Sequence, residues 1–324
     1  MRNPLLAALL AAVCATAWAQ SNSPDPQRLL DAAEQRSDLF HRATQPFVLE
    51  ADVTAQLNVR SEGQLLIRWG AKDKWRQEIK LGPFAMVKTK NGENTLTLRN
   101  VPYTPQRVKD LAYLLEFANG DLGYTVRDLK RRKDGGQDVN CISYVETVNL
   151  QQQTLACLDT ATNNVLSLSE DRKAPAVEKR REEFSDFADF DGMRYPRQLR
   201  LFANGSLVLS VRITKLAPEP FDDKFLALPP EAIARRECKG EIPPKPLNAP
   251  EAELPPGAPS GGVSVALTVL ANGSVSDIHV AGTSSSLLND AALKAVMAYK
   301  FRPAMCGPEP VVFDATIEIN FRRY

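Results

Sequence analysis

Cysteine is the residue type whose spacing in this sequence points most directly to chemistry. Cys141 and Cys157 flank a stretch of strand–turn–strand character that turns near residues 149–152, so their thiols could meet across a hairpin. Four cysteines follow the N-terminal segment, and four cysteines allow three connectivities. The pairing across the hairpin would leave Cys238 to bond Cys306. We expect structural disulfides, since none of the spacings suits a zinc ion.

The other reactive residue types do not combine into a catalytic pattern. His41 and His279 are the two histidines of the chain, which leaves few ways to build a nucleophile–histidine pair. Glu182 and Glu183 could act as paired carboxylates, but we interpret them as part of a solvated face. The sequence has no glycine-rich phosphate loop and no HExxH motif. We therefore predict a binding protein with no catalytic residues, metal or cofactor, rather than a hydrolase.

The length and charge of the chain limit the class of protein further. The chain has 324 residues, of which 44% are hydrophobic, and a formal net charge of +1. This length is typical of two domains of about 150 residues each. The near-zero net charge gives no general attraction to nucleic acid or to anionic membranes, so we expect no nucleic-acid partner.

The N-terminal residues have the pattern of a secretory signal. Arg2 is followed by the apolar stretch Leu5–Val13 and by Ala17-Trp18-Ala19, a small-x-small cleavage motif before Gln20. We predict a signal peptide over residues 1–19 and a periplasmic location, where disulfides can form. The alternative is an uncleaved segment that anchors the protein in the inner membrane.

Residues 27–228 form the first predicted domain, which is rich in strands. An amphipathic helix is expected over 27–41, then strands over 47–57, 63–69, 74–79, 85–89 and 95–99. A second helix follows, with Thr104 as its N-cap and Pro105 at its first position. Further strands run to residue 216. The fold class is α+β, with an antiparallel half-barrel in this domain.

Residues 263–324 form the second predicted domain, with the order ββαβ. Strands over 263–269 and 275–280 flank Asn272-Gly273, a strong hairpin signal. An amphipathic helix covers 288–299. The final strand, 311–321, places alternate side chains on one face: Val311, Phe313, Ala315, Ile317, Ile319 and Phe321.

The C-terminal segment, from about residue 245 to 324, resembles the C-terminal domain of the TonB family. The residues that carry the resemblance are Leu288, Asp290, Ala291, Ala292, Leu293, Tyr299, Lys300, Phe301, Pro303 and Ala304. The resemblance implies that the last strand captures an extended peptide by strand addition, without covalent chemistry. It implies, as partner, the N-terminal plug segment of an outer-membrane receptor or another envelope protein with an exposed strand.

The chain departs from the TonB pattern ahead of this domain. Residues 229–262 contain nine prolines, which predicts a stiff linker that is short for a TonB arm. The segment before the first strand has Leu254-Pro255 and no tyrosine. A bond between Cys238 and Cys306 would hold the start of this linker against the C-terminal domain. The resemblance therefore implies the fold and the peptide-binding edge more than it implies energy transduction.

The first domain resembles the LolA/LolB-like group of lipoprotein carriers. The motifs are GQLLIRWGAKDKWRQEI, CLDTATNNVLSLSE and FADFDGMRYPRQLRLFANG. The resemblance implies a concave sheet under a helix, with acyl lipid as cargo. The residues expected to line such a cavity include Trp69, Trp75, Met86 and Leu115. The alternative function is therefore that of a periplasmic lipid or lipoprotein carrier, whose C-terminal domain serves only to dock the protein at the envelope.

Overall fold

A computed structural model of the chain describes residues 25–57, 59–92, 94–101, 103–118, 123–146, 149–171, 178–230, 232–235 and 241–322. The predicted signal peptide, residues 1–19, and Cys238 lie outside the described residues. Within the described part of the chain, none of the helices combines the length and the apolar character that crossing a membrane requires.

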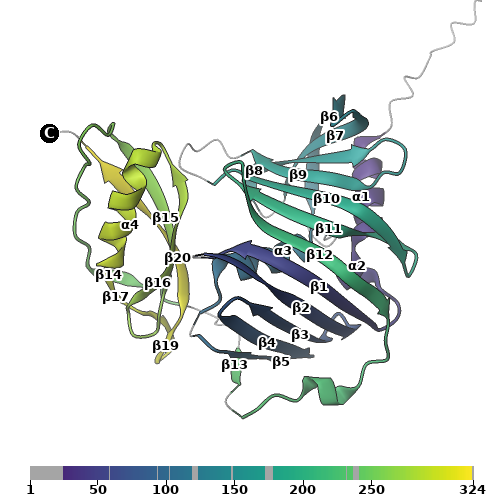
Figure 1. The fold of residues 1–324 in the computed structure, drawn as a ribbon, viewed down its shortest axis with the longest axis horizontal. Coiled ribbons are helices and arrows are strands. Elements are labelled where there is room, and N and C mark those ends of the chain that lie inside the picture. Colours follow the sequence, from purple (N-terminus) through teal and green to yellow (C-terminus); the bar gives the residue numbers. More distant parts are fainter. Residues whose placement is uncertain are drawn as a thin grey trace, which may run out of the picture.

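One antiparallel sheet dominates the fold (Figure 1). Its thirteen strands have the order β13-β5-β4-β3-β2-β1-β12-β11-β10-β9-β8-β7-β6 and do not close into a barrel. The predicted α+β class with an open half-barrel is confirmed. The strands are β1 (Phe47–Gln56), β2 (Arg60–Ala71), β3 (Lys74–Leu81), β4 (Phe84–Asn91), β5 (Asn94–Arg99), β6 (Tyr124–Asp134), β7 (Gln137–Glu146), β8 (Asn149–Asp159), β9 (Val165–Asp171), β10 (Arg180–Phe190), β11 (Met193–Ala203), β12 (Ser206–Pro218) and β13 (Ile233–Arg235).

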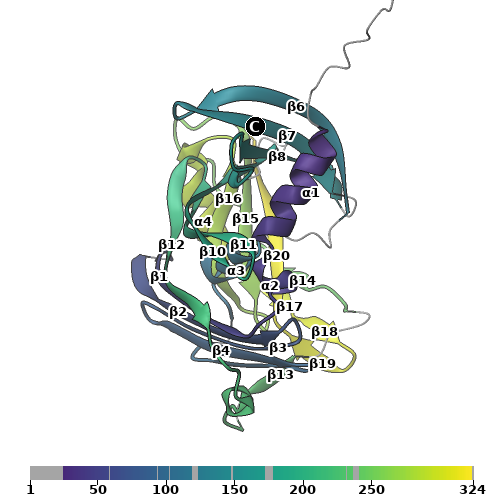
Figure 2. The same cartoon turned by 90° about the vertical axis from the view of Figure 1, so that its right-hand side faces the viewer.

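Three helices, α1 (Pro26–Ser37), α2 (Leu39–Arg42) and α3 (Gln106–Leu115), pack inside the curl of this sheet (Figure 2). Asp25 begins α1, because its carboxylate accepts the Gln27 N–H at 3.0 Å. The apolar faces of the helices join the inward side chains of the strands in one hydrophobic core. From the helices this core contains Leu30, Ala33, Leu39, Val108, Leu111, Leu114 and Leu115.

The predicted hairpin disulfide is present. Cys141 in β7 lies directly opposite Cys157 in β8, and the two sulfur atoms are bonded. The turn comes earlier than expected, because Glu146 already pairs with Asn149. Cys306 is also disulfide-bonded.

The C-terminal domain is a three-stranded sheet of order β16-β15-β20 covered on one face by α4. Its hairpin turns at Gly273, which has φ +80°, and a Cβ atom there would lie 2.0 Å from the Phe301 carbonyl oxygen. The elements are β15 (Gly261–Val269), β16 (Val275–Thr283), α4 (Asn289–Met297), β17 (Lys300–Arg302), β18 (Ala304–Cys306), β19 (Glu309–Val311) and β20 (Phe313–Phe321), with short 3-10 turns at Ser286–Leu288 and, before β13, at Asp223–Leu226.

Parts of the proline-rich segment 229–262 belong to sheets in both domains. Its strand β13 pairs with β5 of the large sheet, and β14 (Lys245–Asn248) pairs with β17. Leu254 and Ala258 pack in the C-terminal core. Prolines therefore alternate here with short paired stretches, so the described parts of the segment are not a free spacer.

Candidate functional site

The predicted peptide-binding strand lies at one edge of the C-terminal sheet. Among the described residues, β20 pairs with β15 alone, and the nine residue pairs between them show no register shift. Its odd-numbered residues face the core, and its even-numbered ones are exposed. Val311 is separate from this strand, because it belongs to β19 and pairs with Ala304 of β18. The remaining predicted residues, Phe313, Ala315, Ile317, Ile319 and Phe321, all lie on β20.

The hydrogen bonds of Gly262 indicate which backbone atoms of β20 point outward. Gly262 donates its N–H to Ser284 Oγ and accepts the Ser284 N–H, both at 3.0 Å, so its polar groups face β16. Across from Gly262 on the other side lies Asn320. Backbone groups alternate in direction along an antiparallel strand. The outward N–H and C=O groups of β20 therefore belong to Asn320, Glu318, Thr316 and Asp314.

The opposite edge of the sheet, β16, is irregular. Its register with β15 shifts twice, and Asp277 has φ +50°, the left-handed region that non-glycine residues seldom adopt. Such bulges twist an edge away from further pairing. Of the two edges, β20 is therefore the better template for another strand.

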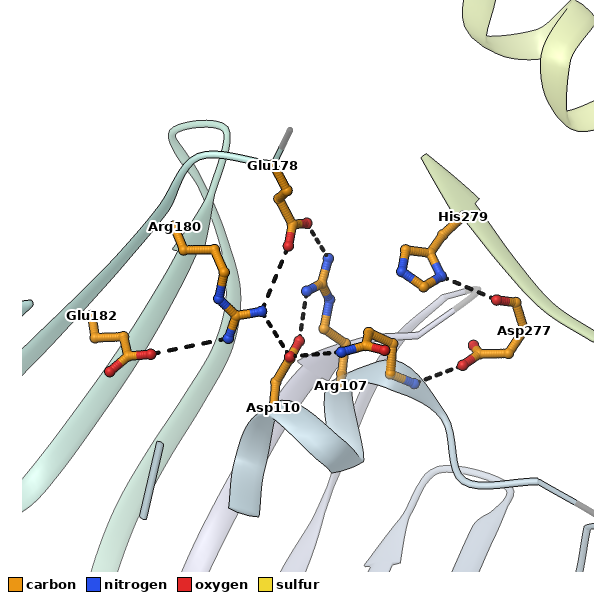
Figure 3. A network of polar contacts seen from close by, with 8 residues as sticks. Arg107, Asp110, Glu178, Arg180, Glu182, Asp277 and His279 are labelled. Carbon is orange, nitrogen blue, oxygen red and sulfur yellow. Dashed lines mark hydrogen bonds and ion pairs between the residues drawn. The ribbon is translucent and has the colours of Figure 1, made fainter. Parts of the chain in front are cut away.

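The carboxylate of Asp277 caps a helix of the other domain. Asp277 Oδ2 accepts the backbone N–H of Gln106, the first residue of α3, at 2.7 Å (Figure 3). The prediction of Thr104 as the N-cap and Pro105 as the first helical residue is wrong, because α3 begins at Gln106 and Pro105 occupies the N-cap position. The Thr104 hydroxyl accepts a hydrogen bond from Arg99 at 2.9 Å. A second contact, Lys109 Nζ to Asp314 Oδ1 at 2.7 Å, joins α3 to β20. The start of α3 and the outer face of the sheet enclose a cavity of about 100 Å³.

A buried ion network fixes α3 to the large sheet (Figure 3). Asp110, whose side chain is 1% exposed, lies 2.7 Å from Arg107 and 2.8 Å from Arg180 of β10. Burial alone would raise the pKa of Asp110, but the two guanidinium groups outweigh it and hold that pKa below its ordinary value. Arg107 also contacts Glu178 at 3.0 Å. At the other end of α3, the buried hydroxyl of Tyr195 donates to the Leu115 carbonyl.

A basic and aromatic cavity of about 210 Å³ lies between β2–β4 and the helices α2 and α3. Three of the predicted cavity residues, Trp69, Trp75 and Leu115, line it. Met86 belongs instead to the hydrophobic core, with 8% of its surface exposed. The polar part of the lining carries positive charge, and consists of Lys72, Lys88, Lys90, His41, Gln77 and Glu116.

A second cavity, of about 170 Å³, lies between α1, α3 and β6–β10 and is lined by five glutamates and by Arg180. Burial raises the pKa of Glu34 to about 8 and that of Glu182 to about 7. Glu116, just after α3, lines both cavities. Although carboxylates gather here, the described residues contain no group of three His, Cys, Asp or Glu side chains placed to hold a metal ion. The acidic lining consists of Glu34, Glu116, Glu146, Glu170 and Glu182.

Sequence reasoning missed part of this arrangement. The interpretation of Glu182 as solvent-facing is wrong, since its side chain is only 16% exposed and lies 4.0 Å from Arg180. The signal was present in the alternation of β10, which places Arg180, Glu182 and the buried Phe184 on one face. No comparable signal marks Asp277, whose partner Gln106 is 171 positions away.

Comparison with known proteins supports the C-terminal assignment. Residues 258–322 match the family model described as the Gram-negative bacterial TonB protein C-terminal. The resemblance inferred from the motif around α4 is therefore confirmed. No curated protein matches the chain.

Several solved structures are similar to the first domain at low identity. A LolA superfamily protein from Nitrosomonas europaea has a TM-score of 0.42 and 9% identity, over 63% of this chain and 97% of that one. A putative outer membrane lipoprotein-sorting protein domain from Vibrio parahaemolyticus has a TM-score of 0.43 and 11% identity, over 62% and 96%. A DUF1329 family protein from Desulfovibrio piger has a TM-score of 0.44 and 12% identity, over 63% and 98%.

Proposed function

We propose that this protein is a periplasmic, TonB-like binding protein that captures an extended peptide segment of an envelope partner as a further strand on β20. The fit of residues 258–322 to the TonB C-terminal family supports this proposal. The partner that the family suggests is the N-terminal plug segment of an outer-membrane receptor. The role of this protein is non-covalent binding of that partner in transport across the envelope.

The observation that carries the proposal is the regular, unshifted edge of β20. The outward N–H and C=O groups of Asp314, Thr316, Glu318 and Asn320 form a row that an incoming strand can pair with. Two of these side chains are acidic: Glu318 accepts a hydrogen bond from Ser264 at 2.8 Å, whereas Asp314 already pairs with Lys109 of α3 at 2.7 Å. A peptide with a basic side chain opposite Glu318 is therefore the favoured occupant.

Replacing Thr316 with proline tests this function directly. Thr316→Pro removes one outward N–H while leaving the hydrogen bonds between β20 and β15 in place, because proline is tolerated on an edge strand. We expect binding of synthetic plug-segment peptides, made from the outer-membrane receptors of the same organism, to weaken about tenfold in calorimetry. Unchanged affinity in a folded variant would exclude strand addition at this edge.

Two matched variants make the result interpretable. Thr316→Val keeps the backbone N–H and removes only the hydroxyl, so it should bind as the parent protein does. Ile317→Pro removes an N–H that faces β15, and should unfold the C-terminal domain rather than affect binding selectively. Circular dichroism of each variant separates these two effects.

A second candidate function is that of a carrier, and the cavity lined by Trp69, Trp75 and Leu115 favours it. A cargo would lie between the concave sheet and α3. Native mass spectrometry of protein purified without detergent tests this role. Co-purified small molecules would favour the carrier, whereas an apo mass across preparations, together with no uptake of added ligand, would contradict it.

A further inference from the structure

The concave face of the first domain changes in character from strand to strand. Along one row of directly opposed residues, Phe47 of β1 is followed by Trp69 of β2, Trp75 of β3 and Lys90 of β4. The row beside it ends on Lys88 of β4, which lies opposite Gln77. Because opposed residues of a pleated sheet share a face, the cavity is apolar at its β1 end and cationic at its β4 end.

The apolar end is rigid and aromatic. Phe47 and Trp69 stack with ring centroids 5.1 Å apart and planes inclined by 16°. Leu115 and Ala112 of α3 also line the cavity. Both rings are nearly buried, so the indole faces are fixed by the packing around them. Such a wall receives a flat or branched apolar group at little entropic cost.

The cationic end is held in position by contacts within the protein. Lys88 Nζ lies 5.5 Å from the centroid of the Trp75 ring, a cation–π contact that keeps the ammonium group beside the cavity. Lys72, Lys88 and Lys90 place three ammonium groups against the single carboxylate of Glu116. His41 is paired with the buried Asp38 at 2.6 Å, so it adds little net charge. The cavity therefore has a net positive lining.

One buried donor beside the cavity has no acceptor. The indole Nε1 of Trp69, a residue 5% exposed that lines the cavity, is without a hydrogen-bond partner in the described chain. Buried donors without acceptors are uncommon, and an unseen water, ion or ligand is an ordinary explanation. This atom has almost no accessible surface, so the aromatic faces and the lysine side chains, rather than this donor, select the cargo.

We propose that this cavity binds a small organic anion with an apolar body, the anionic group at Lys88 and Lys90 and the apolar group against Trp69 and Trp75. The inference rests on the second candidate function, and specifies its cargo as amphiphilic and negatively charged rather than neutral. A carboxylate, sulfonate or phosphate ester all meet this description. The volume of about 210 Å³ limits the enclosed part to a ring system or a short chain.

A pair of fluorescent probes with one aromatic body tests the charge requirement. Anilinonaphthalene sulfonate carries an anion, and phenylnaphthylamine has nearly the same rings without it. With the full chain, we expect the sulfonate to bind at least tenfold more tightly, with energy transfer from tryptophan and with an affinity that falls as salt is added. Inorganic phosphate alone should not displace it at equal concentration, whereas a naphthalene carboxylate should.

Lysine variants locate the binding site. Lys88→Gln combined with Lys90→Gln should weaken sulfonate binding about tenfold or more, as expected when a charge-assisted hydrogen bond is lost. Lys80→Gln is the matched control, because Lys80 is exposed on the same sheet and lies on β3 one residue after the inward Ile79. Equal loss in both variants would indicate surface binding and overturn the proposal.

The remaining outcomes separate this inference from the carrier role. If both probes bind equally and the lysine variants behave as the parent does, the cavity takes neutral apolar cargo, so the carrier role survives and the anion preference is refuted. If neither probe binds, the anion preference and the carrier role are both refuted. Displacement by inorganic phosphate at the concentration of the carboxylate would also refute the requirement for an apolar body.

Discussion

Asp277 Oδ2 lies 2.7 Å from the backbone nitrogen of Gln106, so a carboxylate of the C-terminal domain caps a helix of the N-terminal domain. A negative charge at a helix N-terminus satisfies an orphan N–H and interacts favourably with the helix dipole. Since α3 begins at Gln106 and has no side-chain cap from its own segment, the two domains share one capping interaction.

Replacing Asp277 with asparagine should loosen the contact between the domains. Asparagine tolerates the positive φ of this position, so the change removes charge without adding backbone strain. We expect a loss of about 0.5–1 kcal/mol and faster amide exchange over residues 106–110, measured by mass spectrometry. Asp290→Asn, within the first turn of α4, is the control and should leave α3 unchanged. Equal protection of α3 in both variants would show that the negative charge of the Asp277 cap is dispensable.

The acidic cavity should make the first domain less stable as the pH rises. Burial raises the pKa of Glu34 from 4.5 to about 8, so the folded state keeps a proton that the unfolded state releases. The contribution of protonated Glu34 to the free energy of unfolding is therefore fully present below about pH 4.5. It is lost as the pH rises towards 8, by roughly 2 kcal/mol after allowance for partial exposure.

A neutral glutamine at position 34 should remove the share of that dependence that Glu34 contributes. Between pH 5 and 8.5 the parent Tm is expected to decline by several degrees, and that of Glu34→Gln by clearly less, because Glu182, whose pKa is raised to about 7, still titrates in the same cavity. Differential scanning fluorimetry across this range measures it. Glu62→Gln, at an exposed position, should decline as the parent does, and a decline of the same size in Glu34→Gln would contradict the assignment.

Asp110 should be among the most sensitive polar positions of the chain. Its replacement by asparagine leaves Arg107 and Arg180 without the carboxylate they both contact at 2.7 and 2.8 Å. We expect a loss of about 3 kcal/mol in urea unfolding. Asp189→Asn removes an exposed pair with Arg194, where Asp189 is 76% exposed, and should cost below about 0.5 kcal/mol. Similar losses in the two variants would argue against a buried network.

The bond between Cys141 and Cys157 should stabilise the hairpin of β7 and β8. The cysteines are 16 positions apart, and closing a loop of this size in the unfolded chain contributes about 3 kcal/mol. The double change to alanine should lower the urea midpoint accordingly. Reductant should lower the midpoint of the parent protein but have a smaller effect on the variant, in which Cys306 still responds.

Local patterns predicted the elements whose cause is local. The alternation of residues 311–321 predicted the final strand, which begins at Phe313, and Asn272-Gly273 predicted the hairpin before it. The opposed cysteines followed from the strand–turn–strand pattern between them. Thr104 met every local criterion for an N-cap, yet α3 begins one residue later, with Pro105 at the N-cap position, and the side chain that accepts the Gln106 N–H is Asp277 from the other domain.

The charge of each cavity could not be predicted, because it depends on which strands become neighbours. Lys88 and Lys90 join Trp69 and Trp75 only through the register of β2, β3 and β4. The glutamates of the second cavity come from α1, the end of α3 and strands β7, β9 and β10. The prediction that Val311 begins the last strand is wrong, because alternation cannot show that this part of the chain pairs with β18 before β20 begins.

Helix α3 stands between the basic cavity, for which we propose a ligand, and the sheet whose strand β20 we propose as the peptide-binding edge. Ala112 and Leu115 line the basic cavity, while Gln106 and Lys109 contact the C-terminal domain. Two sites that share one rigid element are linked by reciprocity: if occupancy of the cavity shifts α3 and changes peptide affinity by some factor, the peptide must change cavity affinity by that same factor. Cargo bound in the cavity would then change the affinity of β20 for its peptide. The ligand-free and the loaded protein would therefore bind the same partner with different affinities.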